Sequence, residues 1–296
     1  MSDDLVDPFV THRSLLFTVA YEMLGSAADA EDVVQETWLR WADMGDAGRE
    51  EVRDPRAYLV RIVTRQALNR LRTLARQRED YVGAWLPEPL LTSPDVAEDA
   101  ELADSLSMAM LLVLETLTPT GRAVFVLREV FDLGYDELAE AVDRSPAAVR
   151  QIAHRARMHV AERRPRGVIS PAETRGALEA FQRAIETGDL QSFVDILAPD
   201  VVALSDGGGV KQAVPRPIVG ADKVARLLAA GLAALGAGMS AELAQVNGWP
   251  ALIIRLDTEL DSVVAMRVED GLVRGIYTVR NPEKLSRILR QAAVSR

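Results

Sequence analysis

The 296-residue sequence contains no cysteine and only three histidines, His12, His154 and His159. The absence of cysteine excludes disulfides and thiolate metal sites, and three scattered histidines do not form an ordinary zinc cluster, so we expect no metal and no cofactor. No run approaches the ~18 apolar residues of a membrane span, and the acidic start, MSDDLVDPFV, is unlike a signal peptide. These absences favour a globular cytoplasmic protein without a membrane partner.

The sign of the charge alternates along the chain, although the net charge is −10. Residues 22–51 hold nine acids against two bases, and residues 53–80 hold eight arginines against three acids. Residues 79–121 are acidic and contain no lysine or arginine, and residues 144–166 hold seven arginines against one acid. Any contact with DNA must therefore come from the two local basic clusters and not from the overall charge.

Residues 129–160 predict two helices around a tight turn. Ser145 is a good N-cap, and Pro146 fits the first position of the second helix. One side of that helix is apolar, and the opposite face carries Ala147, Arg150, Gln151, His154, Arg155 and Met158. Arginine binds guanine edges or phosphates, and a small residue near the helix start permits close approach. We interpret this face as a reader of the DNA major groove; a solvated basic helix is the alternative.

The first basic cluster predicts a helix that begins after Asp54 and Pro55. At helical spacing a charged stripe forms, with two further polar residues beside it, and the set is Arg61, Arg65, Arg72 and Arg76 with Asn69 and Arg70. Tyr58 is either a core residue or a stacking surface for an unpaired base, and core packing is favoured. The stripe is a candidate nucleic-acid contact, although exposed arginines on a helix often serve only solubility.

Upstream, the segment AADAEDVVQETWLRWADM has an apolar strip with acidic edges. The strip consists of Val33, Val34, Thr37, Trp38 and Trp41. Such a strip either docks on a basic partner helix or packs into the protein's own core, and the residues alone favour the core.

The order of these segments resembles the bacterial RNA polymerase sigma factors of the extracytoplasmic-function type. The resemblance covers residues 8–166 and rests on LLFTVAYEMLGSAADAEDVVQETWLRWAD, DPRAYLVRIVTRQALNRLR, the acidic linker and LTPTGRAVFVLREVFDLGYDELAEAVDRSPAAVRQIAHRARMHV. It implies that residues 54–76 melt and read the minus-ten element, that residues 145–159 read the minus-thirty-five element, and that the linker threads through the polymerase near the RNA exit path. The partners so implied are promoter DNA and the beta and beta-prime subunits of core polymerase. Contact with the beta-prime clamp helices falls to Asp29, Asp32, Gln35, Glu36 and Trp38.

A third segment follows, with helices expected near residues 189–197 and after Gly220. Turn signals at residues 246–250 and 269–271 separate the apolar runs ALIIRL, SVVAMRV and LVRGIYTV, which predict an antiparallel sheet packed on helices. This α+β segment resembles the SnoaL-like branch of the cone-shaped NTF2 fold. Such a cone readily leaves a cavity, so we expect a small apolar ligand there before we expect catalysis. The segment has no histidine, which leaves Asp206, Asp257 or Asp261 as a general base.

Three short motifs resemble the signatures of the sigma subgroup that carries a fused SnoaL-like domain. They are Trp85, Leu86, Pro87, Glu88, Pro89 and Leu90 in the linker, Asp206, Gly207, Gly208 and Gly209 after a strand, and Asn281, Pro282, Glu283, Lys284 and Leu285 near the C-terminus. We expect the linker motif to dock near the glycine loop through Trp85 as an apolar anchor, with the C-terminal motif tuning the contact. Val210 stands where the signature has lysine, and Lys211 follows, which leaves the expected salt bridge in doubt.

The sequence therefore predicts a multidomain protein, with two all-α sigma domains and a C-terminal α+β domain of cone-shaped SnoaL/NTF2-like fold. The predicted segments are sigma domain 2 at residues 1–80, the acidic linker at 81–104, sigma domain 4 with a helix-turn-helix at 105–166, and the SnoaL-like regulatory domain at 170–296. The predicted function is that of a promoter-specific sigma subunit and not of an enzyme. A ligand-sensing helix-turn-helix regulator independent of polymerase is one alternative, and a DNA-tethered isomerase or cyclase is another.

Overall fold

The computed structural model describes residues 7–79, 81–93, 96, 99–164, 170–235, 238–288 and 291–295, with the side chains of residues 75–79, 100, 235 and 291 outside the description. The chain divides into two compact units. The first comprises Met1–Glu79, Val113–Arg163 and Ala293–Arg296, and the second comprises Asp80–Leu112 and Arg164–Ala292. The segment predicted as a linker therefore belongs to the same unit as the C-terminal sheet.

The first unit begins with four helices, which we call the N-terminal bundle: α1 (Pro8–Leu24), α2 (Ala27–Asp43), α3 (Gly45–Glu50) and α4 (Pro55–Glu79). Asp7 caps α1 by accepting a hydrogen bond from the Phe9 amide at 2.7 Å, and Gly25 ends it in the left-handed conformation. Most of the strip on α2 is buried in this bundle, namely Val33, Val34, Thr37 and Trp41. The preference for core packing of the strip is thus confirmed, while Trp38 stays partly exposed against Phe9.

The same unit contains the helix-turn-helix segment. Its helices are α8 (Pro119–Phe125), the π-helical turn η1 (Val126–Val130), α9 (Tyr135–Val142) and α10 (Pro146–Arg163). The turn between α9 and α10 uses Asp143 at a positive φ of 55°, and the Ser145 hydroxyl accepts a hydrogen bond from the Ala148 amide at 3.3 Å. The predicted N-cap and the predicted proline at the first helical position are both confirmed.

A buried arginine joins these two parts of the first unit. The side chain of Arg122 in α8 is 2% exposed and forms an ion pair with Glu115 at the end of α7 (Met108–Glu115). Its Nε donates to the carbonyl of Glu22 in α1 at 2.9 Å. Because a buried guanidinium needs partners for its charge and its N–H groups, Arg122 fixes α8 against α1 in this arrangement.

The second unit contains a mixed sheet in the order β3-β2-β7-β6-β5-β4-β1-β8. The strands are β1 (Leu91–Thr92), β2 (Leu197–Asp206), β3 (Ile218–Val219), β4 (Met239–Val246), β5 (Trp249–Leu256), β6 (Glu259–Glu269), β7 (Leu272–Val279) and β8 (Gln291–Ala292). The prediction of an antiparallel sheet holds for β4 to β7, but β2 pairs with β7 and β1 pairs with β8 in parallel. The predicted helix near residues 189–197 is also shorter, because α12 spans Gln191–Val194 and β2 begins at Leu197.

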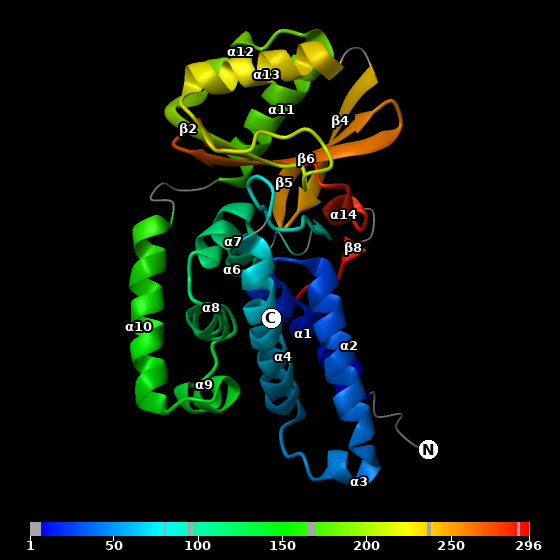
Figure 1. Ribbon diagram of the computed structural model, residues 1–296, viewed down its shortest axis with the longest axis vertical. Coiled ribbons are helices and arrows are strands. Elements are labelled where there is room, and N and C mark those ends of the chain that lie inside the picture. The colour runs from blue at the N-terminus through cyan, green and yellow to red at the C-terminus, as the bar shows by residue number, and fades with distance from the viewer. Residues whose placement is uncertain are drawn as a thin grey trace. The chain divides into compact units, whose positions relative to one another are not determined.

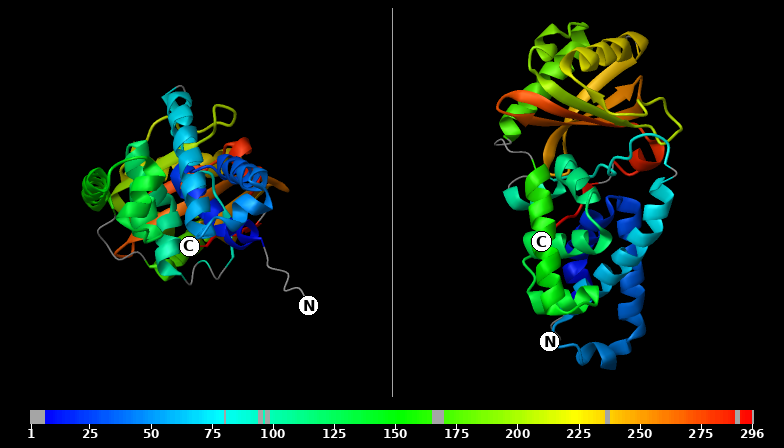
Figure 2. Two further views of the ribbon diagram at one scale, coloured as in Figure 1. Left: turned by 90° about the horizontal axis from the view of Figure 1, so that it is seen from below. Right: turned by 60° about the vertical axis from the view of Figure 1, so that its left-hand side comes forward.

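Each face of the sheet has its own apolar core. Helices α11 (Pro171–Thr187), α12 and α13 (Ala221–Leu235) cover one face, as Figures 1 and 2 show, with Phe181, Phe193 and Leu252 among the buried side chains. On the other face, Ile253 and Val279 pack with Leu86 and Met108 of the predicted linker and its following helix. The alternation of side chains along each strand puts successive residues into these two cores. Leu86 and Met108 complete the second core together with Leu285 and Ile288.

The helix α14 (Pro282–Leu285) and the short helix α6 (Ala100–Leu106) complete the second unit together with the start of α7. The Asn281 side chain caps α14 by accepting from the Glu283 amide at 3.0 Å. The two-residue turn Asn247–Gly248 joins β4 to β5, and Asp270–Gly271 joins β6 to β7, all four residues at positive φ. Both predicted turn signals are therefore confirmed as hairpins that suit primed turns.

Replacement of Arg122 by alanine should lower the free energy of unfolding of the first unit by about 3–5 kcal/mol, because it removes a buried guanidinium together with its ion pair to Glu115 and its hydrogen bond to the Glu22 carbonyl. Urea denaturation followed by far-ultraviolet circular dichroism measures the change. The control is Arg163→Ala, which removes an exposed ion pair to Glu162 and should cost about 0–1 kcal/mol. Equal losses in the two variants would contradict the role given to Arg122.

Candidate linker-docking site and nucleic-acid interface

The linker motif, the glycine loop and the C-terminal motif come together in the second unit, and we call this the linker-docking site. The carboxylate of Asp206, at the end of β2, is 1% exposed and accepts a hydrogen bond from the Leu86 amide at 2.9 Å. Leu86 itself is fully buried in the core that Ile253 and Val279 line. The site thus holds the linker through both its backbone and its apolar side chain.

Lys284 of α14 joins the three motifs at one ammonium group. Its Nζ donates to Asp206 Oδ2 at 2.7 Å and to the carbonyl of Leu86 at 2.6 Å. The same ammonium lies 4.2 Å from the centroid of the Trp85 ring, a cation–π geometry. Trp85 is half-buried, so the buried apolar anchor is Leu86 and not Trp85 as expected, although Trp85 does contact the C-terminal motif.

Tyr81 is a member of the site that the motif analysis missed. Its hydroxyl donates to Asp206 Oδ1 at 2.6 Å and accepts from Asn281 Nδ2 at 2.9 Å. Burial and the hydrogen bond to Asp206 raise the pKa of Tyr81, so the hydroxyl keeps its proton at neutral pH and remains a donor. The only sequence signal was its position four residues before Trp85, which by itself does not indicate a contact with Asp206.

The glycine loop permits an approach that a side chain would block. Gly208 has a φ of 63°, and a Cβ there would lie 2.5 Å from Asn281 Cγ. The Gly208 amide also donates to Asp206 Oδ1 at 3.0 Å. The loop therefore brings the C-terminal motif against Asp206, which agrees with the expected close backbone approach.

The lysine displaced by one position in this sequence does form a salt bridge. Lys211 Nζ lies 2.9 Å from Asp261 Oδ1, and Arg280 Nη2 lies 2.9 Å from the same oxygen. Burial alone would raise the pKa of Asp261, but the hydrogen bonds from Arg280 and Lys211 outweigh it and lower the pKa. Val210, in the position of the signature lysine, is 74% exposed. The salt bridge that was in doubt is therefore present, and Lys211 forms it.

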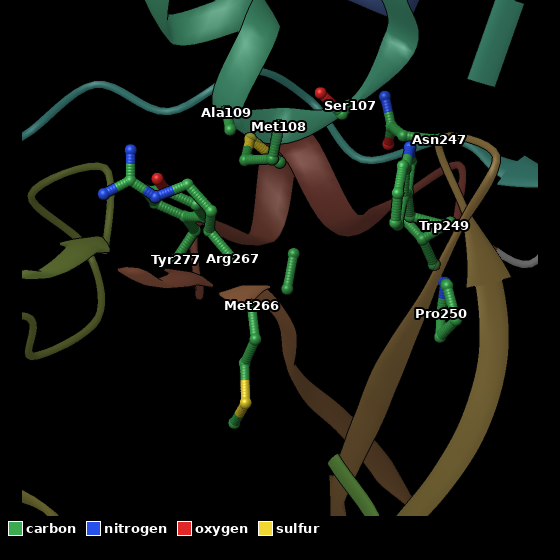
Figure 3. Close-up of a pocket in the computed structure, with 11 residues that line it drawn as sticks. Ser107, Met108, Ala109, Asn247, Trp249, Pro250, Met266, Arg267 and Tyr277 are labelled. Atoms are coloured by element: carbon green, nitrogen blue, oxygen red, sulfur yellow. The ribbon is translucent and has the colours of Figure 1, made fainter. Parts of the chain in front are cut away.

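A small pocket lies between the sheet and the start of α7, in the second unit (Figure 3). Met108 and Ala109 face it from the helix, and Trp249, Arg267 and Tyr277 line it from the sheet. Its volume of about 30 Å³ has room for one or two water molecules. A pocket of this size does not decide the small-ligand cavity expected in the domain, which stays a prediction.

The predicted reading face of α10 is open to solvent. Ala147, Arg150, Gln151, His154 and Arg155 are exposed, whereas Val149, Ala153 and Ala156 on the opposite side are buried. Arg150 also lies over the Tyr135 ring at 5.5 Å. The helix therefore presents the predicted polar face while its apolar side packs on α8 and α9, as an amphipathic recognition helix requires.

The predicted arginine stripe on α4 is partly occupied by α9 of the same unit. Arg61 Nη1 lies 3.0 Å from Glu140 Oε2, and Arg65 Nη2 donates to the Glu140 carbonyl at 2.9 Å. Arg72 is exposed and donates to Asn69 Oδ1 at 3.1 Å, and the side chain of Arg76 lies outside the described part of the chain. Tyr58 is half-buried against Trp41, with ring centroids 6.0 Å apart, which agrees with core packing.

Arg70 differs from the rest of the predicted DNA-binding set. Its guanidinium bonds Asp29 at 2.5 Å and Asp32 at 3.4 Å, both in α2. The hydrogen bond to Asp29 is the main cause of a raised pKa of Arg70. Gln35 and Glu36 remain exposed on the same helix. Arg70 thus holds α2 against α4 and links the predicted DNA-binding set to the predicted polymerase-binding set.

The candidate acids for catalysis have other partners in this structure. Asp206 and Asp261 are both buried in ion pairs with Lys284 or Lys211, and Asp257 occupies a turn at a positive φ of 56°. Burial raises the pKa of Tyr277, the tyrosine of the sheet, while the charge of Arg267 lowers this pKa and the charge of Glu269 raises it. Among the residues that the structure describes, no group of three or more histidine, aspartate or glutamate side chains is arranged to hold a metal ion. Within the same residues, no helix has the length and apolar character needed to cross a membrane.

Two family models match the chain: Sigma-70 region 2 matches residues 9–77, and Sigma-70 region 4 matches residues 107–160. The ECF RNA polymerase sigma factor SigJ of Mycobacterium tuberculosis is 37% identical over 95% of this chain and 93% of its own. The probable ECF RNA polymerase sigma factor SigI of the same species is 31% identical over 93% of this chain and 92% of its own.

The crystal structure of M. tuberculosis SigJ aligns with a TM-score of 0.76 at 34% identity, over 95% of this chain and 98% of that one. The match includes both helical regions and the C-terminal α+β domain, so the predicted multidomain fold is confirmed. The chain belongs to the ECF RNA polymerase sigma factors.

Proposed function

We propose that this sigma factor directs RNA polymerase to specific promoters and that its C-terminal domain regulates it by holding the linker. The observation that carries the proposal is the linker-docking site, where one buried carboxylate and one lysine fasten the segment between regions 2 and 4. Run-off transcription with purified core polymerase tests it. Failure to support initiation at any promoter that region 2 and region 4 select would contradict the proposal.

The two DNA-reading regions contact each other in the first unit. Glu140 of region 4 occupies Arg61 and Arg65 of the minus-ten-reading helix. These arginines cannot bind phosphates while Glu140 holds them, which supports weak promoter binding by the free protein. The net charge of −10 acts in the same direction.

The polymerase-binding role falls on the exposed side of α2. Asp32, Gln35 and Glu36 are exposed there, and Trp38 is partly exposed. Arg70 fixes the position of this helix on α4. We assign contacts with the beta-prime subunit to Asp29, Asp32, Gln35, Glu36 and Trp38. Region 4, when it is bound to the minus-thirty-five element, contacts the beta subunit. We assign Arg70 to holding α2 in place on α4 and not to binding DNA.

The C-terminal domain acts as a regulatory scaffold and not as an enzyme. Asp206 and Asp261, the buried candidate bases, are neutralised by cations that also fasten the domain. A small apolar ligand on the face of the sheet that carries Leu86 and Met108 would displace these side chains, and through Leu86 it would compete with the linker. The polymerase-independent regulator and the isomerase or cyclase remain distinguishable alternatives, since the first would bind an operator tightly without polymerase and the second would show turnover.

Replacing Arg150 or Arg155 with alanine should weaken recognition of the minus-thirty-five element by about 1–3 kcal/mol where the side chain reads a base edge. Asn69→Ala should instead impair melting of the minus-ten element, and a premelted bubble should restore it. Run-off transcription on duplex and bubble templates measures both. Arg175→Ala, an exposed arginine of α11, is the control. Full rescue of Arg150→Ala by the bubble, with none for Asn69→Ala, would reverse the assignment.

Glu140→Gln should raise the affinity of the free protein for promoter DNA by less than about fivefold, because an exposed ion pair contributes about 0–1 kcal/mol. Asp136→Asn is the matched control, since it removes one exposed carboxylate from the same helix. Fluorescence anisotropy at two salt concentrations measures the difference. An equal rise in both variants would assign the effect to net charge and not to the ion pair with Arg61, since both variants keep the backbone carbonyl of residue 140 that Arg65 contacts.

Truncation should affect activity in two directions. A chain ending at Asn281 loses Lys284 and β8 but keeps strands β2 to β7, so it should release the linker and transcribe more. A chain ending at Gly167 leaves Leu86 and Met108 without the core that buries them, so it should transcribe less. Leu86→Ala should reproduce part of the larger deletion, because loss of a buried leucine costs about 2–5 kcal/mol, and Trp85→Ala should do so more weakly.

Run-off transcription compares these chains at equal concentrations of core polymerase. A cysteine at Gly209, with a second at Val82, should crosslink in the intact chain, since a Cβ at Gly209 would lie 3.3 Å from Val82 Cβ. The chain has no cysteine of its own, so the crosslink is unambiguous. Equal activity in all chains, together with no crosslink, would leave the C-terminal domain without a regulatory role.

A further inference from the structure

The turn between β4 and β5 makes a second contact with the linker, separate from the three motifs. Asn247 is 2% exposed, and its backbone amide donates to the Leu90 carbonyl at 2.8 Å. Its side-chain Oδ1 accepts from the Leu90 amide at 2.9 Å, while its Nδ2 donates to the Leu106 carbonyl at 3.0 Å. One amide group therefore holds Leu90 of the linker and Leu106 of α6, which are sixteen residues apart in the sequence.

The two residues after Asn247 extend this contact. The Gly248 amide donates to Thr92 Oγ1 at 3.0 Å, and the Trp249 indole N–H donates to the Ala103 carbonyl at 2.8 Å. Gly248 has a φ of 73°, and a Cβ there would lie 2.8 Å from Ala103 Cα. Beside the turn, β1 of the linker pairs with β4, Leu91 opposite Val246. Figure 3 shows Asn247 and Trp249 next to Ser107 at the start of α7.

We propose that this turn is a clasp that shortens the connection between regions 2 and 4, with Asn247 as its positioning residue and the backbones of Leu90 in the linker and Leu106 in α6 as its partners. The clasp deepens the proposed function, and its mechanical consequence rests on that function. A turn that served only to reverse the chain would need its two residues at positive φ, but it would not need a buried side-chain amide that both accepts from and donates to the same linker.

The length of the linker shows what the clasp controls. From Glu79 to Met108 a fully extended chain reaches about 100 Å, but with Leu90 and Leu106 held at one amide the reach falls to about 55 Å. The minus-ten and minus-thirty-five elements are named for their positions before the transcription start, so they lie about 25 base pairs apart. This separation is about 85 Å of straight duplex. The closed clasp thus favours regions 2 and 4 in one compact unit, and its release gives the linker the length to span the promoter.

The test compares Asn247→Gly with Asp270→Gly. Both replace the first residue of a two-residue hairpin turn at positive φ, where glycine is well tolerated, but the turn at Asp270 is exposed and its Gly271 amide donates to Glu173 of α11. Trp249→Phe is a second variant, which keeps the ring and removes the N–H that reaches Ala103. Circular dichroism confirms that each variant is folded.

Hydrogen exchange at the Leu90 amide is the first measurement, and it should accelerate at least tenfold in Asn247→Gly and stay unchanged in Asp270→Gly. The second is the distance between spin labels at Val10→Cys and Met158→Cys, two exposed positions in regions 2 and 4 of the cysteine-free chain. In Asn247→Gly a population of molecules with a longer distance between the labels should appear. In Trp249→Phe this population should be smaller.

Unchanged exchange and unchanged distances in Asn247→Gly relative to Asp270→Gly would overturn the clasp. Faster exchange at Leu90 without a longer distance would also overturn it, because the turn would then hold the linker without limiting its reach. Neither measurement uses polymerase, so they decide the clasp independently of run-off transcription, whose failure would contradict the proposed function instead.

Discussion

The buried carboxylate of Asp206 is the constraint on which the arrangement of the second unit depends. A carboxylate removed from water must be neutralised and hydrogen-bonded, and here the donors come from Lys284, Tyr81, Leu86 and Gly208. Each donor belongs to a different segment of the chain, apart from the two in the linker. Loss of any one donor leaves the Asp206 carboxylate incompletely hydrogen-bonded. The linker and the C-terminal motif are therefore coupled through this single carboxylate.

The contacts that hold the linker contribute more free energy than the exposed ion pair between the two helical regions of the first unit. Full burial of Leu86 contributes about 1.5–3 kcal/mol, and hydrogen bonds to a charged group contribute about 1.5–3 kcal/mol each. The ion pair between Arg61 and Glu140 is exposed on the acid side and contributes about 0–1 kcal/mol. The contacts of the linker are therefore the stronger set, whereas the ion pair of Glu140 with Arg61, one of the predicted DNA-binding residues, is weak and easily broken.

Much of this organisation was predictable from the sequence, because local rules determine it. The cap at Ser145, the turns at Asn247 and Asp270 and the exposed face of α10 follow from propensity and periodicity. The parallel pairing of β1 with β8 and the place of Tyr81 were not predictable, since neither periodicity nor a motif reports a partner more than a hundred residues away. The same limit explains Trp85 and Leu86: composition selects the larger side chain as the anchor, but the three-dimensional core selects Leu86.

Because the chain is synthesised from its N-terminus, β1 exists before β4 and cannot pair with it at first. Leu91 leaves the ribosome about 155 residues before its partner Val246, and regions 2 and 4 are complete in between. Since domains generally fold as they emerge, the nascent chain passes through a stage in which both DNA-reading regions exist and the linker has no sheet to join. A newly made chain is therefore unrestrained until its last domain is finished, and the restraint is a property that the protein acquires on completion.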